Sequence, residues 1–321
     1  MEDASLENRV RGVEYRLTEL EKTIPELIGL EENLKQRLKL ADVKISLNPD
    51  LGPAAADVFQ TLVRPEYAAE FVRRCPILPE ENILRRDWAM PPAEQLPDDQ
   101  PLRLGIAFSG GRAICSMVNH ITVEYSDLNV YPLSCAGLPG DVAFSVNTVI
   151  GLFCWKNRNR KVSGTGIPVD PTLLGHIGAD CGQRIRDGML NDIKFRVHYA
   201  FTGIGGVGDN DALPKLARAI GLPADLLANN RVIGDMLYRA ININGGRVQL
   251  DELDSRIIGV DPTLLAGLRE DKNLPLDSVV GVAGGKGKEN AIYAACRGGL
   301  INILVTDIDT AKRLAERPEI P

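Results

Sequence analysis

The feature that most constrains the fold is a regular alternation of short β-rich runs and helical stretches from residue 103 onward. Strands are predicted where Val, Ile, Leu and aromatic residues gather, at 103–109, 122–133, 194–202, 256–260, 279–284 and 301–306. Helices are predicted between or after them, near 111–120, 143–155, 213–219, 262–269, 289–297 and 309–315. Such alternation predicts an α/β fold with a mainly parallel sheet and helices on both faces. Ligands of such sheets bind beyond the carboxyl ends of the strands.

Residues 1–40 predict a helical segment. Apolar side chains recur with alternating spacings of four and three residues, as in a coiled coil, at Leu6, Val10, Val13, Leu17, Leu20, Ile24 and Leu27. Pro25 is expected to break or kink this helix at the residue before it. A second helical stretch at 26–40 carries Leu27, Leu30, Leu34 and Leu38. The segment is therefore either a short coiled coil for self-association or an amphipathic helix that packs on its own domain.

Residues 41–321 are expected to form one α/β domain that an insertion interrupts. A strand is predicted at 41–47 and a helix at 53–62. The stretch 65–101 has prolines at positions 65, 76, 79, 91, 92, 97 and 101 and adjacent aspartates at 98 and 99. Because this composition opposes regular structure, we expect a surface excursion there, which could act as a lid over the loop that follows.

The charge balance argues against a chain that binds nucleic acid by itself. Lys and Arg number 37 and Asp and Glu 43, for a net charge of −6 and a pI near 5.3, whereas nucleic-acid binders carry a basic footprint. The sequence has no run of about 18 apolar residues that could cross a membrane and begins with a charged stretch unlike a secretory signal. We therefore expect a cytoplasmic protein without membrane or direct nucleic-acid contacts.

The cysteines and histidines form neither disulfide nor metal-binding patterns. Cysteines at 75, 115, 135, 154, 181 and 296 are widely spaced, with no CxxC pair, which is typical of reduced thiols. Histidines at 120, 176 and 198 lack the spacing of metal ligands. No metal and no other cofactor is therefore expected.

A first glycine-rich loop, GIAFSGGRA at 105–113, ends a predicted strand at Ser109 and places Gly110 and Gly111 before a helix. Backbone amides at the positive end of a helix suit a phosphate. Ser109 can add a hydroxyl there, and Arg112 a charge-assisted hydrogen bond. A nucleophilic role for Ser109 is disfavoured, because Ala107 stands where a G-x-S-x-G elbow has its first glycine. The alternative is a strand–helix turn that merely needs glycine.

A second loop, GIGGVG at 203–208, also follows a predicted strand and contains Gly203 and Gly205. Its spacing matches the dinucleotide fingerprint, but the polar residues and proline of DNDALPKL follow in place of an immediate helix. Ligand contacts from the loop backbone, or a simple tight turn, are therefore favoured over nicotinamide or flavin binding.

A third loop, VAGGKGKENAI at 282–292, places Gly284 and Gly285 after a strand and Lys288 before a helix. It lacks the GK[ST] arrangement of nucleotide-hydrolysing loops. A cation at the positive end of a helix is unfavourable unless an anion is present, so this loop also indicates phosphate. Farther upstream, Asp235 follows a short apolar run and could accept sugar hydroxyls or cap a helix.

These loops, in this order, resemble the effector-binding domain of SorC-type sugar-binding transcriptional regulators, relatives of the DeoR group. The resemblance runs from about residue 30 to 315. Its most specific stretch is VAGGKGKENAIYAACRGGLINILVTDIDTAKRL at 282–314, which is similar, nearly residue by residue, to the end of the family's domain. SGGRA at 109–113, the GIG at 203–205 and VIGDMLYRAININGGRV at 232–248 resemble the family's phosphate loop, GIG turn and VGD segment.

The resemblance implies a fold similar to glucosamine-6-phosphate deaminase, ribose-5-phosphate isomerase and the CoA transferases. It also implies a phosphorylated sugar or related small metabolite as ligand, and assembly as dimers or tetramers. By motif match, phosphate would be held by Ser109, Gly110, Gly111 and Lys288, and hydroxyls by Asp235.

Two departures from the family pattern stand out. Only about 29 residues precede the matching region, where the family has a helix-turn-helix of about 50 residues, so the DNA-binding part is expected to be absent. Arg112-Ala113 replaces a usual pair of threonines, and the guanidinium could strengthen phosphate capture or fill the pocket.

Three functions follow from these observations. The first is a non-catalytic, oligomeric sensor of a phosphorylated sugar. The second is an isomerase or deaminase acting on a phosphosugar, with Asp235 and His198 as the nearest acid–base candidates, although neither lies in a motif that demands catalysis. The third is a structural or partner-binding subunit with a vestigial pocket.

Overall fold

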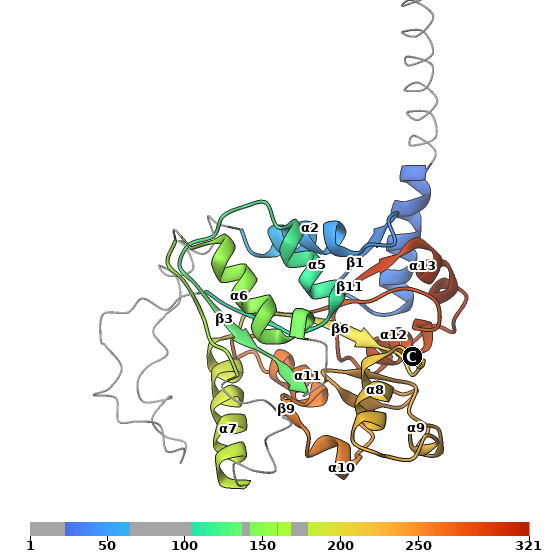
Figure 1. Ribbon diagram of the computed structural model, residues 1–321. Helices are drawn as coiled ribbons and strands as arrows, with labels where there is room; N and C mark the ends of the chain where they lie inside the picture. The colour runs from blue at the N-terminus through green and yellow to red at the C-terminus, as the bar shows by residue number, and fades with distance from the viewer. Residues whose placement is uncertain (1–22, 65–103, 137–141, 159, 168–178, 321) are drawn as a thin grey trace, which may run out of the picture.

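A parallel sheet forms the centre of the computed structural model, which describes residues 23–64, 104–136, 142–158, 160–167 and 179–320 (Figure 1). In spatial order its strands are β1 (Asp42–Ser46), β11 (Ile303–Asp307), β10 (Ser278–Val282), β6 (Tyr199–Gly205), β2 (Leu104–Phe108), β3 (Leu128–Pro132) and β5 (Val162–Gly164). All neighbours along this path pair in parallel, so their carboxyl ends share one edge. The predicted α/β class with a mainly parallel sheet is confirmed.

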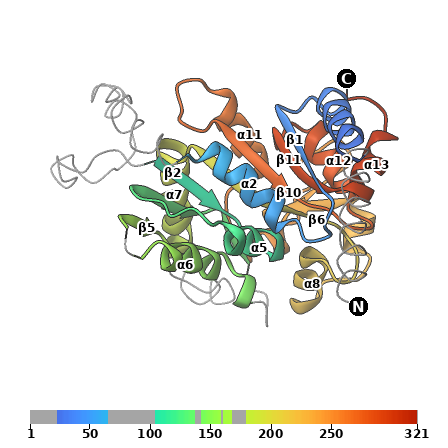
Figure 2. The ribbon, with the colours of Figure 1, turned by 90° about the horizontal axis from the view of Figure 1, so that it is seen from above.

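Helices cover both faces of this sheet (Figure 2). On one face lie α2 (Gly52–Leu62), α5 (Arg112–His120) and α6 (Val146–Lys156), which follows a short 3-10 turn (Val142–Phe144). Their core is aromatic, with Phe59 at its centre against Phe108, Phe153 and Phe201. On the other face lie α7 (Ala179–Arg196), α11 (Pro262–Glu270), α12 (Glu289–Arg297) and α13 (Ile308–Ala315), over an aliphatic core. Strand residues alternate between the cores, as Leu304 and Val305 do.

A smaller unit extends from the carboxyl end of β6. The hairpin of β7 (Gly234–Met236) and β8 (Arg239–Ile241) pairs antiparallel with β6. It packs with α8 (Ala212–Ala219), α9 (Leu226–Asn229) and α10 (Asp251–Asp254) around a separate apolar cluster. The predicted strand at 256–260 exists as β9 (Ile257–Gly259), but it lies outside the main sheet and pairs antiparallel with β4 (Ser134–Ala136).

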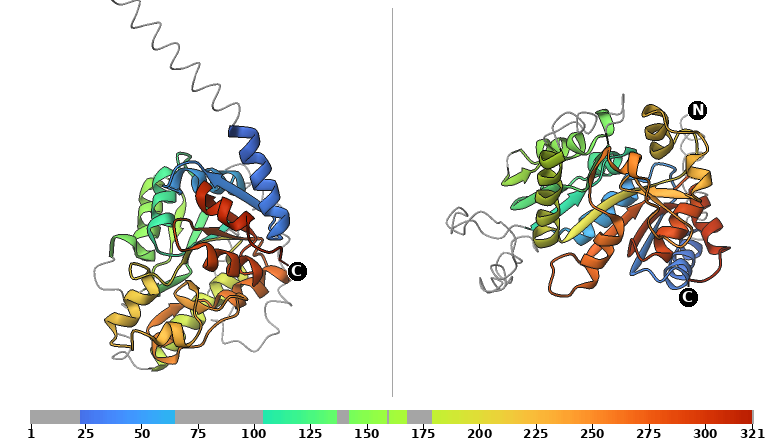
Figure 3. Two further views of the ribbon diagram at one scale, coloured as in Figure 1. Left: turned by 90° about the vertical axis from the view of Figure 1, so that its right-hand side faces the viewer. Right: turned by 90° about the horizontal axis from the view of Figure 1, so that it is seen from below.

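The first described helix spans residues 23–37 and lies beside α13 near the C-terminus (Figure 3). It continues across Pro25, so the predicted break at that residue is wrong. Leu34 and Leu38 are buried and Leu27 and Leu30 half-buried in the aliphatic core, as in an amphipathic helix on its own domain. Ile24 and Ile28 remain 50% and 59% exposed. The upstream heptad residues 6–20 and the predicted insertion at 65–101 lie outside the described residues.

The described residues that flank the predicted insertion lie at the amino edge of the sheet. Residue 64 follows the end of α2, and residue 104 begins β2. The amide of Thr122, just after α5, donates to Oε1 of Gln60 near the end of α2. Both ends therefore lie at the amino edge of the sheet, opposite the glycine loop that a lid would cover. Within the described residues, no helix is long and apolar enough to cross a membrane.

Candidate functional site

The three glycine-rich loops meet at the carboxyl edge of the sheet. They follow β2, β6 and β10, which are neighbours, so the outer two strands lie about 10 Å apart. The Ser109 amide donates to the Phe201 carbonyl (2.9 Å), and the Gly203 amide donates to Ser109 Oγ (3.2 Å). The first and second loops are therefore joined directly, with the third loop on the far side of β6.

The first loop uses several of its polar groups within the protein. Gly111 has a φ of +110°, which disfavours other residues, and its amide donates to the Phe144 carbonyl (2.8 Å). The Ser109 hydroxyl donates to the Gly110 carbonyl (2.9 Å). What this loop offers a ligand is therefore the start of α5, whose first amides have no partner inside the helix. The Arg112 side chain, at the first position of α5, is exposed.

Side chains at the start of α13 fix the shape of the third loop. The Gly285 amide donates to Asp307 Oδ2 (2.6 Å) and to Thr310 Oγ1 (3.0 Å) at the start of α13. Burial alone would raise the pKa of Asp307, but hydrogen bonds from Thr310 and Gly285 hold the pKa below its usual value. The carboxylate therefore stays ionised and fixes the turn that leads to Lys288, the residue directly before α12.

Asp235 is the buried carboxyl of this edge. It lies on β7, directly opposite Gly205 of β6, and is 5% exposed. The backbone approaches so closely that a Cβ at position 205 would overlap Asp235 Oδ1, and therefore only glycine fits there. Among the described residues, Oδ1 has no hydrogen-bond partner. A buried acceptor left without a donor is costly, and its usual explanation is a ligand or water that is not part of the protein.

The surroundings of Asp235 set its ionisation. Burial, with a smaller contribution from the charge of Asp211, raises the pKa of Asp235 to about 7, although the Tyr238 amide and the charge of Lys288 act in the opposite direction. This carboxyl can therefore accept a hydrogen bond or carry a proton near neutral pH. The charges of Asp211, at the start of α8, and of Lys288, directly before α12, thus both act on Asp235 of β7.

Asp211 and the β7–β8 turn were not predicted as parts of the site. Asp211 Oδ2 accepts from the Gly208 amide (2.9 Å) and lies beside Gly206, within the second loop. Leu237 and Tyr238 form the two-residue turn with φ of +57° and +62°, a strained conformation for such side chains. The signal for Asp211 was the DND that follows GIGGVG, whereas Leu-Tyr gives no turn signal at all.

His198 does not belong to this group. It precedes β6, so it lies at the amino edge, about 23 Å along the strand from Gly205. Its Nδ1 accepts from the Gly105 amide (3.1 Å), and its own amide donates to the Gly105 carbonyl (2.8 Å). Burial lowers the pKa of His198 to about 4, which keeps the ring neutral. His198 and Asp235, the two acid–base candidates, therefore lie at opposite edges of the sheet and do not face one ligand.

Comparisons with known proteins agree with this architecture. Residues 187–316 match the family model described as a putative sugar-binding domain, a segment that contains Asp235 and Lys288 but not Ser109. The transcriptional regulator LsrR of Enterobacter sp. (strain 638) is 40% identical over 115 residues, 35% of this chain and 33% of that protein. The sorbitol operon regulator of Klebsiella pneumoniae is 26% identical over 220 residues, 65% of this chain and 64% of that protein.

Solved structures share the fold at lower identity. The full-length sorbitol operon regulator SorC from Klebsiella pneumoniae superimposes with a TM-score of 0.65 at 19% identity, over 91% of this chain and 82% of that one. A probable sor operon regulator from Shigella flexneri gives 0.64 at 20% identity, over 91% of this chain and all of that one. These matches show that the chain shares the fold of these two regulators.

Together, the family model, the sorbitol operon regulator and its solved structure support a SorC-type sugar-binding regulator domain, the family that the sequence motifs resemble. It spans about a third of the length of the Enterobacter relative and less than two thirds of the Klebsiella relative.

Proposed function

We propose that this chain senses a phosphorylated sugar or a related small metabolite and acts as the effector-binding part of a transcriptional regulator. The observation that carries the proposal is the unpartnered Oδ1 of Asp235, which lies within electrostatic reach of Lys288 at the edge where the three loops meet. A carboxylate and an ammonium in one site suit the hydroxyls and the phosphate of one ligand.

In this proposal, different groups of the protein bind the phosphate and the hydroxyls of the ligand. The phosphate lies between the first amides of α5, beyond Gly110 and Gly111, and the ammonium of Lys288. Arg112 is exposed beside this position and can reach the outer phosphate oxygens. The backbones of Gly203, Gly205, Gly284 and Gly285 shape the floor. Asp235 accepts a hydroxyl hydrogen through Oδ1, which satisfies the acceptor that the protein itself leaves open.

A thermal-shift panel tests this function. Glucose 6-phosphate, fructose 6-phosphate, ribose 5-phosphate and other sugar phosphates are compared with the same sugars without phosphate and with inorganic phosphate. A bound ligand at a hundredfold excess over Kd raises the free energy of unfolding by about 2.7 kcal/mol, a few degrees for a chain of this size. The Lys288→Met variant should lose the shift. A panel without any shift, or shifts that Lys288→Met retains, would contradict the proposal.

A proton-transfer activity is the second candidate, and the pKa of Asp235 near 7 is the observation that favours it. The reaction would be an isomerase- or deaminase-like step on the same phosphosugar, with Asp235 as base. Exchange of a substrate hydrogen with deuterated water, abolished in Asp235→Asn, would support this candidate. Exchange at the same rate in Asp235→Asn would rule it out.

Assembly and location complete the proposal. We infer that the chain forms a dimer or tetramer in the cytoplasm and makes no direct nucleic-acid contact of its own. Ile24 belongs to the predicted apolar stripe, and Ile28 lies one helical turn further on; both are exposed and offer a seam for a second copy. The double substitution Ile24→Asn with Ile28→Asn should lower the mass in solution without lowering the melting temperature. An unchanged mass would remove this seam from the proposal.

A further inference from the structure

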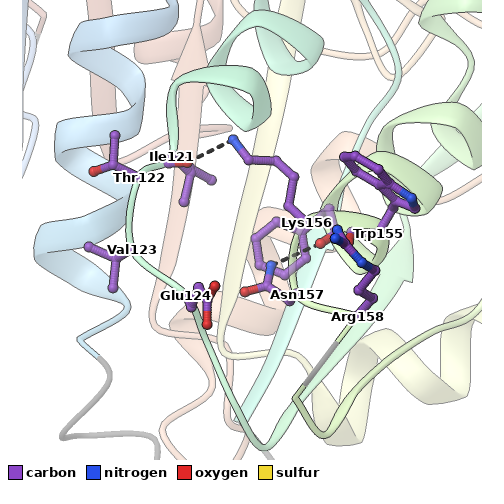
Figure 4. Close-up of a pocket in the computed structure, with 9 residues that line it drawn as sticks. Ile121, Thr122, Val123, Glu124, Trp155, Lys156, Asn157 and Arg158 are labelled. Atoms are coloured by element: carbon purple, nitrogen blue, oxygen red, sulfur yellow. Dashed lines mark hydrogen bonds between the residues drawn. The ribbon is translucent and has the colours of Figure 1, made fainter.

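A small hollow lies at the amino edge of the sheet, opposite the candidate site. It is formed by the loop after α5, Ile121–Glu124, and by the end of α6 with the residues that follow, Trp155–Arg158 (Figure 4). Its volume is about 240 Å³. Because pockets that enclose a small-molecule ligand range from about 300 to 1,000 Å³, this one suits a single inserted side chain better than a metabolite.

The polar groups beneath the hollow are satisfied by the protein itself. Lys156 Nζ donates to the carbonyls of Val118, Asn119 and Ile121 at 2.7–2.9 Å and so caps the end of α5. The Asn157 side chain accepts from the Tyr125 amide (2.7 Å) and donates to the Phe153 carbonyl (2.8 Å). The hollow is therefore preformed, and these buried groups do not call for a bound ion or small ligand.

The rim, in contrast, exposes groups that interfaces use. Trp155 is 63% exposed and Val123 39% exposed. The Arg158 guanidinium lies 4.7 Å from the centre of the Trp155 ring, which presents both as one flat surface. Tryptophan and arginine are the residues most enriched at energetically dominant positions of protein–protein interfaces.

The charge of the rim opposes that of the whole molecule. Arg158, Arg160 and Lys161 are exposed within four positions of the chain, and Glu124 pairs with Arg160 at 3.2 Å. Three cations and one carboxylate leave a local charge of +2, whereas the chain as a whole carries −6. An acidic partner is therefore attracted to this rim and repelled by much of the remaining surface.

We propose that this hollow docks an acidic segment of a partner protein, which inserts one apolar side chain beside Trp155 and places its carboxylates on the surrounding cations. A single-stranded nucleic acid fits less well. Arg158 already covers one face of Trp155, Glu124 would face the phosphates, and a stacking platform needs several aromatic rings along a basic groove. The docking surface lies at the edge opposite the proposed sugar-phosphate site, so it does not depend on that function.

Fluorescence anisotropy on the full chain tests the proposal. The probe is a fluorescein-labelled peptide with one leucine between two runs of four glutamates. We expect saturable binding at low salt that weakens about tenfold in Arg158→Glu and in Trp155→Ala. Trp155 is largely exposed, so its truncation does not empty the core. The exposed Arg256→Glu supplies the same charge change outside the rim and should bind within twofold of the parent protein.

A peptide without leucine, a single-stranded nucleic acid and a second copy of the chain each give a different result. A peptide with serine in place of leucine should bind about fivefold more weakly, because the hollow loses its apolar insert. Absence of saturable binding, or binding that Trp155→Ala and Arg158→Glu leave unchanged, would overturn the proposal. So would tighter, Trp155-dependent binding of oligo(dT) than of the peptide, or self-association that Trp155→Ala abolishes, which would assign the surface to nucleic acid or to a second copy.

Discussion

The two edges of the sheet both carry side chains whose pKa is shifted by burial, yet the partners of those side chains differ. At the amino edge, His198 accepts from Gly105, and Lys156 donates to three carbonyls. At the carboxyl edge, Asp235 keeps an oxygen without a donor and faces the like charge of Asp211. A shifted pKa is therefore common to both edges, and we propose that the open acceptor beside glycine-lined backbone is what distinguishes a binding residue from a structural one.

The largest expected effect is a pH dependence that Asp235 imposes on the ligand-free protein. The folded protein holds this proton up to about pH 7, whereas the unfolded chain releases it near 3.8. Because unfolding then releases a proton, Asp235 should lower the free energy of unfolding by about 4 kcal/mol in total as pH rises from about 4 to 7. His198 acts in the opposite direction between pH 6.5 and 4, so the quantity to compare is the difference between the parent protein and Asp235→Asn, measured by urea denaturation at several pH values. A difference that does not change with pH would contradict the raised pKa of Asp235.

The second-largest effect is expected on ligand affinity, which a substitution at the carboxyl edge should lower and a substitution at the amino edge should not. In Asp235→Ala, the affinity for the sugar phosphate that gives the largest thermal shift should fall about a hundredfold, since a hydrogen bond to a charged group contributes about 1.5–3 kcal/mol. Calorimetric titration measures the loss. His198→Asn is the matched control at the other edge and should leave the affinity unchanged. Equal losses in both variants would erase the distinction between the edges.

Substitution of Lys156 should lower the stability of the protein without changing its affinity for the ligand. Lys156→Met leaves three carbonyls at the end of α5 without their shared donor and should lower the free energy of unfolding by about 2 kcal/mol. Ligand affinity should not change. Lys161→Met removes an exposed charge nearby and should stay within about 0.5 kcal/mol of the parent protein. Comparable losses in both variants would show that charge, not capping, is what Lys156 supplies.

At neutral pH, the smallest effect is expected for substitutions of His198. His198→Leu leaves the Gly105 amide without an acceptor and should cost about 1 kcal/mol, whereas His198→Asn supplies a side-chain oxygen that can accept. The lowered pKa of His198 also means that stability falls as pH drops from 6.5 towards 4, because the unfolded chain binds the proton more readily. Equal stability of the Leu and Asn variants would contradict the acceptor role.

The sequence predicted the parallel sheet and most of its helices because apolar strand runs alternate with helical stretches, and three of the strands, β2, β6 and β10, lead into glycine-rich loops. It also predicted that Lys288 and the three glycine loops follow strands, and parallel strands bring such loops to one edge. His198 was misjudged because the predicted strand at 194–202 includes it, whereas α7 runs to Arg196 and β6 begins only at Tyr199. Because His198 precedes β6, it lies at the amino edge.

The smaller unit was harder to predict for local physical reasons. Strands β7 and β8 have three residues each, too few for an alternating pattern, and Leu237–Tyr238 replaces the Asn-Gly that marks a tight hairpin. Without that hairpin, nothing in the sequence brings Asp235 next to Gly205 or near Asp211. Long-range pairing, rather than any local motif, creates the buried carboxyl.

We propose that the carboxyl edge forms one receptacle for a phosphate-bearing ligand. Tungstate, a heavy tetrahedral analogue of phosphate, tests it directly by anomalous diffraction from soaked crystals. We expect a peak between the start of α5, beyond Gly111, and the side chain of Lys288, and its loss in Lys288→Met. A peak confined to the basic rim at Arg158–Lys161, with none at the carboxyl edge, would contradict the claim.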